Sequence, residues 1–89
     1  MDKLQTSPNY RPLYEQIKVL ITQSLIQGEW KPGESIPSEF DLAFRFKVSQ
    51  GTVRKAIDSL ANEKILIRRQ GKGTFVATHE EEKIQLRFL

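Results

Sequence analysis

Residues 48–65, VSQGTVRKAIDSLANEKI, decide the fold. The apolar positions in this stretch follow the i, i+3, i+4, i+7 spacing of a helix with one buried face: Val53, Ala56, Ile57 and Leu60. Ser49 can cap this helix, which is predicted to end near residues 62–64. Its opening turn contains Gly51, which weakens a helix by about 1 kcal/mol relative to alanine. A helix built only for packing would avoid this residue, whereas a first turn that must approach another molecule closely would tolerate it.

Two helices are predicted upstream of this stretch. The first has Pro12 at its opening position and Gly28 as its C-terminal stop, with an apolar stripe formed by Leu13, Ile17, Leu20, Ile21 and Leu25. The second is the short segment SEFDLAFRF, which Ser38 can cap and which buries Leu42, Ala43 and Phe46. Phe40 and Phe44 lie elsewhere on its surface, four residues apart, and are expected to form a second contact.

The downstream part changes period from helix to strand. The runs ILIRRQ and TFVAT are joined across GKG, which predicts a hairpin. Three helices followed by a two-stranded hairpin predict an α+β fold, a winged helix-turn-helix over residues 11–77. Residues 1–10 are expected to be a flexible tail, and residues 78–89 a linker and the start of a truncated C-terminal effector-binding domain. The alternating segment 84–88 predicts a half-buried strand, which pairs in a dimer or folds back if no further domain follows.

Composition narrows the function classes. A chain of 89 residues without cysteine predicts one domain with no disulfide and no thiolate metal site. No apolar run is long enough to span a membrane and no signal peptide opens the chain, so the cytoplasm is the expected location. The net charge is +3, but residues 49–73 hold six basic and two acidic residues and the remainder sums to −1. The basic block points to a polyanionic partner, although charge alone fits an ordinary solvated surface equally well.

The opening turn of the 48–65 helix carries the chemistry expected of a recognition helix. In a helix-turn-helix this turn enters the major groove of DNA, so its residues must be small or polar. Ser49 and Thr52 offer hydroxyls, although both also suit ordinary capping, and Gln50 can pair with an adenine edge. Arg54, one turn on, can reach a guanine edge or a phosphate, and Lys55 is expected to meet phosphate.

The hairpin tip has the chemistry of a wing. Lys72 stands between two glycines, and a thin tip of this kind fits a minor groove only about 6 Å wide, whose potential attracts cations. The flanking residues Arg68, Arg69, Gln70 and Thr74 can hold phosphates. The complete set of predicted DNA-binding residues is Ser38, Arg45, Ser49, Gln50, Gly51, Thr52, Arg54, Lys55, Arg69, Gln70, Gly71, Lys72, Gly73 and Thr74.

These motifs resemble a known family. The segments PLYEQI, GEWKPGESIPSEFDLA, VSQGTVRKAI and RRQGKGTFV, spanning residues 12–76, are similar to the winged helix-turn-helix of GntR-type bacterial regulators, most of all the HutC branch with a UTRA-type effector domain. The resemblance implies a dimeric regulator, usually a repressor, that binds near-palindromic operators and responds to a small metabolite. It also implies DNA contacts at Ser38, Gln50, Thr52, Arg54, Gly71, Lys72 and Gly73.

The sequence departs from the family pattern at two positions. Many members have arginine after PSE, where this chain has Phe40, and many have arginine after the serine of the VS turn, where it has Gln50. Two cations directed at guanine or phosphate are therefore absent, and the affinity is expected to rest on Arg54, Lys55 and the wing. Arg45 is the candidate to replace part of the lost phosphate contact.

Two other function classes explain the sequence less well. A winged-helix module used only for protein association would explain the apolar alternation at 84–88, but not the basic first turn or the Gly-Lys-Gly tip. An enzyme is disfavoured because the single histidine, His79, lies beside the acidic run 80–82 with no defensible metal-ligand spacing. Neither a catalytic residue nor a metal or cofactor site is expected. Trp30 and Tyr14 are expected in the core or an interface.

Overall fold

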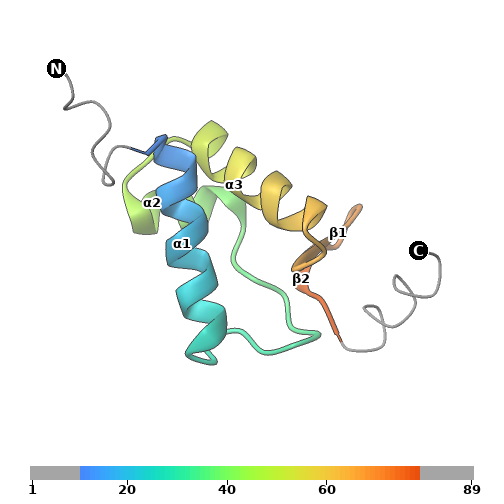
Figure 1. The fold of residues 1–89 in the computed structure, drawn as a ribbon. Helices are drawn as coiled ribbons and strands as arrows, with labels where there is room; N and C mark the ends of the chain where they lie inside the picture. The colour runs from blue at the N-terminus through green and yellow to red at the C-terminus, as the bar shows by residue number, and fades with distance from the viewer. Residues whose placement is uncertain (1–10, 79–89) are drawn as a thin grey trace, which may run out of the picture.

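The computed structural model describes residues 11–78 and contains three helices and one hairpin (Figure 1). The elements follow in the order α1 (Leu13–Ile26), α2 (Glu39–Phe46), α3 (Gln50–Asn62), β1 (Leu66–Arg69) and β2 (Gly73–Val76). The predicted α+β winged helix-turn-helix is therefore confirmed. The predicted strand at 84–88 and the predicted linker with His79 lie outside the described residues.

The starts of α2 and α3 are fixed by serine caps, as predicted. Ser38 Oγ accepts a hydrogen bond from Asp41 N at 3.0 Å, and Ser49 Oγ accepts one from Thr52 N at 3.1 Å. Between the two helices, Lys47 takes a left-handed conformation with φ 59°, which ends α2 and starts the short turn that leads to α3. At α1 the prediction was off by one position, because Pro12 is the N-cap and not the first helical residue.

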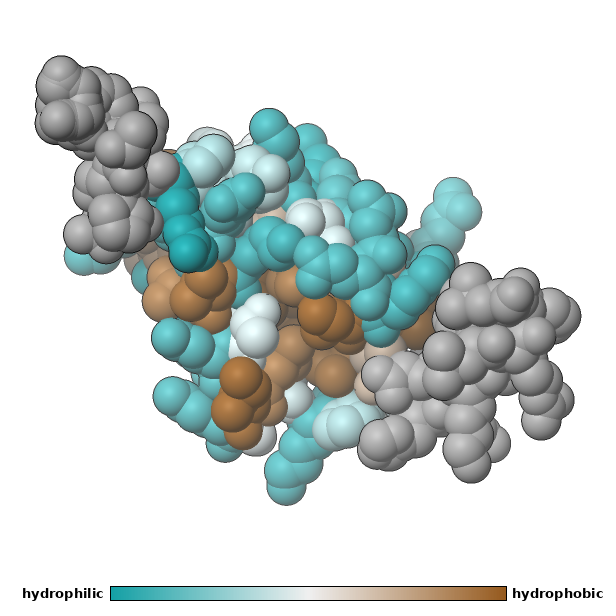
Figure 2. All heavy atoms as spheres, in the orientation of Figure 1, coloured by the Kyte–Doolittle hydropathy of each residue, from teal (hydrophilic) through white to brown (hydrophobic). Residues whose placement is uncertain are grey.

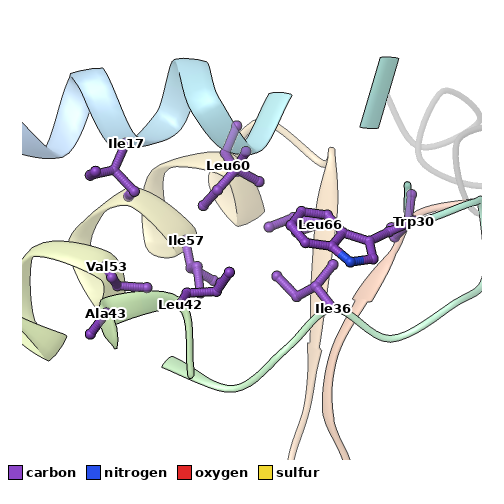
Figure 3. Close-up of a cluster of buried hydrophobic side chains, with 12 residues drawn as sticks. Ile17, Trp30, Ile36, Leu42, Ala43, Val53, Ile57, Leu60 and Leu66 are labelled. Carbon is purple, nitrogen blue, oxygen red and sulfur yellow. The ribbon is translucent and has the colours of Figure 1, made fainter. Parts of the chain in front are cut away.

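A single core lies between α3 and the elements around it (Figure 3). The predicted face of α3 is buried in full, and Leu42 and Ala43 of α2 join it, with Phe46 packed at its edge. Burying an aliphatic side chain of this size stabilises the fold by about 1.5–3 kcal/mol. Trp30 is buried in this core and Tyr14 packs against it, as expected.

The predicted stripe on α1 is only partly correct. Ile17 and Ile21 are buried and Leu25 packs against the core, but Leu13 and Leu20 are exposed. The reason is that α1 packs chiefly against one helix, α3, and one helix covers a narrower face than the stripe spans. Figure 2 shows brown side chains standing between teal ones on the face where α1 lies.

The connection between α1 and α2 is more ordered than the turn-rich segment predicted from the sequence. Ser35 forms a bridge with Phe75, Gly33 N donates to Val76 O at 2.8 Å, and Ile36 N donates to Thr74 O at 2.9 Å. The connection therefore lies along one edge of β2 through a single isolated bridge, while β1 pairs with the other edge of β2 in antiparallel register, Leu66 opposite Val76. In Figure 1 the connection can be followed from the foot of α1, past the hairpin, to α2.

Within residues 11–78, no helix is long and apolar enough to cross a membrane and no group of acidic or histidine side chains could hold a metal ion. The second contact predicted for Phe40 and Phe44 is not formed in this part of the chain, since the two residues are 65% and 83% exposed.

Candidate nucleic-acid interface

A groove of about 500 Å³ brings the predicted binding segments together. One wall is the start of α2, a second is the start of α3, and the third is the wing. The lining includes Ser38, Glu39, Phe40, Gln50, Arg68, Lys72, Gly73 and Thr74. Residues from Ser35 to Thr74, which are far apart in sequence, thus share one concave surface, because α2 and strand β1 of the hairpin both pack against α3.

The first turn of α3 presents backbone donors. Ser49 Oγ caps Thr52 N and lies 2.9 Å from Thr52 Oγ1, so the two hydroxyls are first of all bonded to the helix and to each other. The N–H groups of Gln50 and Gly51 have no acceptor inside the helix, because the first N–H groups of any α-helix lack a preceding turn. Donors of this kind at a helix N-terminus attract phosphate.

Gly51 is not required by the protein's own packing. A Cβ placed on it would meet only Ser49 Oγ, at 3.9 Å, an ordinary van der Waals distance. Its backbone is in the helical region, so no left-handed conformation calls for glycine either. The glycine therefore leaves open space on the outer surface of the first turn, where a ligand's backbone or base edge would approach.

Arg54 reaches back toward the start of α2. Its Nε donates to Glu39 Oε1 at 3.1 Å, and 57% of the side chain remains exposed. Within residues 11–78 no acceptor bonds its two terminal nitrogens. The guanidinium is thus held by one carboxylate while its outer edge is available for the bidentate contact that arginine makes with guanine or phosphate.

Glu39 is the residue that the sequence prediction missed. Besides Arg54, its second carboxylate oxygen accepts from Arg68 Nη2 at 3.2 Å, and Arg68 also pairs with Asp58 at 2.7 Å. Glu39 therefore connects α2, the recognition helix α3 and strand β1. From the sequence it was only an acid in the first turn of α2, because its partners are 15 and 29 residues away. Arg68 is engaged in this network, and its contact with a phosphate stays a prediction.

The wing tip has the slender form predicted. Lys72 N donates to Arg69 O at 2.9 Å and closes a turn around Gln70 and Gly71. Gly71 has φ 77°, which a type II turn requires at this position and which glycine adopts without strain. Gly73 at φ 120° starts β2. Because residues 70–73 are all exposed, Lys72 stands at the end of a thin protrusion.

Four other predicted DNA-binding residues contact other protein groups or are largely buried, namely Arg45, Lys55, Arg69 and Thr74. Arg45 makes a bidentate ion pair with Glu29, at 2.6 and 2.8 Å, and its guanidinium lies 5.4 Å from the Trp30 ring centroid. The hydrogen bond from Arg45 lowers the pKa of the Glu29 carboxyl, and the same bond raises the pKa of Arg45.

Lys55 Nζ lies 4.7 Å above the Tyr14 ring, which anchors this cation on the side of α3 that faces α1. In the hairpin, the Arg69 guanidinium lies 5.6 Å from the Phe75 ring centroid. Thr74 lines the groove but is only 9% exposed, so little of its surface can meet a ligand.

Comparison with known proteins finds similarity to bacterial regulators of transcription. Residues 13–76 match the family model described as bacterial regulatory proteins, gntR family. The chain is 49% identical over 65 residues to an uncharacterised HTH-type transcriptional regulator of Bacillus subtilis, covering 73% of this chain and 27% of that protein. It is 42% identical over 66 residues to the histidine utilization repressor of Klebsiella aerogenes, covering 74% and 27%. The chain thus spans about a quarter of the length of these relatives.

A solved structure shares the architecture. The DNA-binding domain of AraR in complex with the operator ORX1 superposes with a TM-score of 0.75 and 42% sequence identity, covering 80% of this chain and 86% of that one. The two domains are therefore similar both in fold and in amino-acid sequence.

Proposed function

Because this chain belongs to the gntR family of bacterial regulatory proteins, we propose that it binds operator DNA as the recognition domain of a metabolite-responsive transcriptional repressor. Membership confirms the resemblance stated from the sequence, and the similarity to a histidine utilization repressor agrees with the expected HutC branch. The family consists of regulatory proteins, which agrees with the expectation that the chain is not an enzyme. The observation that carries the proposal is the groove shared by α2, α3 and the wing.

The proposed mode of binding follows from the shape of this surface. The first turn of α3 enters the major groove, where Gln50 and Arg54 meet base edges and the N–H groups of Gln50 and Gly51 meet a phosphate. The wing tip, with Lys72 between two glycines, enters the adjacent minor groove. The solved AraR domain, which is held in a complex with its operator, supports this mode through its similar fold and sequence.

The remaining expectations rest on the same proposal. The longer protein acts in the cytoplasm as a homodimer on a near-palindromic operator, with its two half-sites roughly 34–36 Å apart, and a C-terminal domain binds the metabolite. The exposed side chains Leu13, Val19, Leu20 and Ile26 on α1 support association with a second copy. They are also the observation in favour of the alternative, a winged-helix module that binds only protein.

Salt-dependent DNA binding distinguishes the two. Duplexes selected from a random pool by this chain are titrated by fluorescence anisotropy at several salt concentrations. Lys72→Ala is expected to weaken binding to all sequences and to reduce the slope of log K against log salt by about one unit, because one phosphate contact is lost. Lys31→Ala removes an exposed lysine away from the groove and is the matched control. Failure to retain any duplex at low salt would favour the protein-association module.

A further inference from the structure

We propose that Phe40 is a specificity-determining residue, which packs its ring against the C5-methyl group of a thymine in the major groove of the operator. The inference deepens the proposed function and rests on it. It assigns a role to one of the two positions at which the chain departs from the family pattern, and it names the base that this position recognises.

The position of Phe40 carries the first step. Phe40 lies in the first turn of α2 and lines the groove together with Gln50 of the recognition helix and Lys72 and Gly73 of the wing. It is 65% exposed, and the hydrophobic core is closed without it. A large apolar ring therefore stands in the surface that is proposed to face DNA, and nothing in residues 11–78 covers it.

Base chemistry carries the second step. Among the groups that base pairs present in the major groove, the C5-methyl of thymine is the one apolar group large enough to pack against a ring, and the other contacts are chiefly hydrogen-bond donors and acceptors. A phenyl ring can neither donate to guanine nor accept from cytosine or adenine, so burying those edges against it leaves polar groups without partners. Against a thymine methyl, the same ring removes apolar surface from water at no such cost.

Neighbouring residues fit this assignment. Gln50, which lines the same groove, carries the amide that suits an adenine edge. The carboxylate of Glu39 is occupied by Arg54 and Arg68, so it is not available to read a cytosine beside the ring. The start of α2 and the start of α3 together therefore favour A·T pairs, and Arg54 is left as the guanine-reading side chain.

Phe44 provides a matched control. It lies one turn further along α2, is even more exposed at 83%, and does not contribute to the groove lining. If exposed aromatic surface on α2 served only solubility or association with protein, the two phenylalanines would behave alike. If the groove faces DNA, only Phe40 affects which base is preferred.

The test replaces thymine by deoxyuridine, which lacks the C5-methyl and pairs identically. Duplexes selected by the 89-residue chain are synthesised with one thymine at a time replaced, and affinities are measured at constant low salt for the parent, Phe40→Ala and Phe44→Ala. For the parent and Phe44→Ala, we expect at least one position per half-site at which the replacement weakens binding about fourfold, the effect of one buried methyl group. Phe40→Ala is expected to bind uracil and thymine equally at that position.

A second variant tests the same assignment by gain of a preference. Phe40→Arg is expected to shift the selected base at this position from thymine to guanine, because arginine pairs with guanine O6 and N7. The inference is overturned if Phe40→Ala keeps the parent's sensitivity to uracil at every position, or if the parent has none. Loss of affinity in Phe44→Ala equal to that in Phe40→Ala, without any change in base preference, also contradicts it and indicates a protein contact. Absence of duplex binding by the parent would instead refute the proposed function.

Discussion

Replacing Gly51 by alanine should make the protein more stable and a poorer ligand for DNA. The methyl group added in the first turn of α3 lies 3.9 Å from its nearest neighbour, Ser49 Oγ, and creates no clash within the fold. Alanine loses less backbone entropy than glycine on entering a helix, so the free energy of unfolding should rise by about 0.5–1 kcal/mol.

The same methyl group should obstruct the approach of DNA. It projects into the open space left at the outer surface of the first turn, where Gln50 and the backbone N–H groups are proposed to meet the major groove. Forcing a methyl group into a close-packed contact costs about 1–3 kcal/mol, which corresponds to a loss of affinity of roughly 5- to 150-fold.

Two measurements check this prediction on the same protein samples. Urea denaturation followed by circular dichroism gives the change in stability, and anisotropy titration of a selected duplex gives the change in affinity. Asn62→Ala is the control, because it raises helix propensity in the last turn of α3, outside the groove. Opposite signs for stability and affinity at Gly51, with no loss of affinity at Asn62, are expected. A Gly51→Ala variant that binds DNA as tightly as the parent would refute the idea that the glycine serves close approach.

Two further predictions concern the charged side chains. Arg54→Ala should weaken binding to the selected duplex by about 1–3 kcal/mol. Because Glu39 holds Arg54 in place, the same substitution should reduce the binding free energy by less in a Glu39→Gln background. A double-mutant cycle measured by anisotropy tests this, and an equal loss of binding free energy in both backgrounds would argue against the coupling. The lowered pKa of Glu29 means that its pair with Arg45 stabilises the fold above the carboxyl's ordinary value of 4.5 and loses this effect as the pH falls through the lowered folded-state pKa. The difference in free energy of unfolding between the parent and Glu29→Gln should therefore be constant at neutral pH and shrink in acid, whereas a difference independent of pH would show that the ion pair is not its source.

The parts of the fold that depend on residues close together in the sequence could be predicted from the sequence. Ser38 and Ser49 cap their helices because the acceptor and the N–H group are three residues apart, and the hairpin follows from glycines at fixed positions. The buried face of α3 was predicted in full, because this helix has neighbours along its whole length. On α1 the prediction included Leu13 and Leu20, since a periodic pattern does not reveal how wide a face the neighbouring helix covers.

For the candidate site, the sequence identified the segments but not the links between them. Glu39 could not be recognised as the partner of Arg54 and Arg68, because the fold alone brings these side chains together. The pairing of Arg45 with Glu29 was missed for the same reason, and it leaves the replacement of a lost phosphate contact by Arg45 as a prediction. The proximity of Phe40 to the wing also depends on tertiary packing, so the sequence alone did not place this exposed ring in the groove.

The bridge between Ser35 and Phe75 has a mechanical consequence. Only one residue, Pro37, separates Ile36, which is hydrogen-bonded to Thr74, from Ser38, the N-cap of α2, so a displacement of the hairpin must also displace that end of the helix. The wing and the start of α2, which are both proposed to contact DNA, are thereby held in fixed relative positions before binding. Less conformational entropy is then lost when DNA binds, so a domain this small can retain useful affinity.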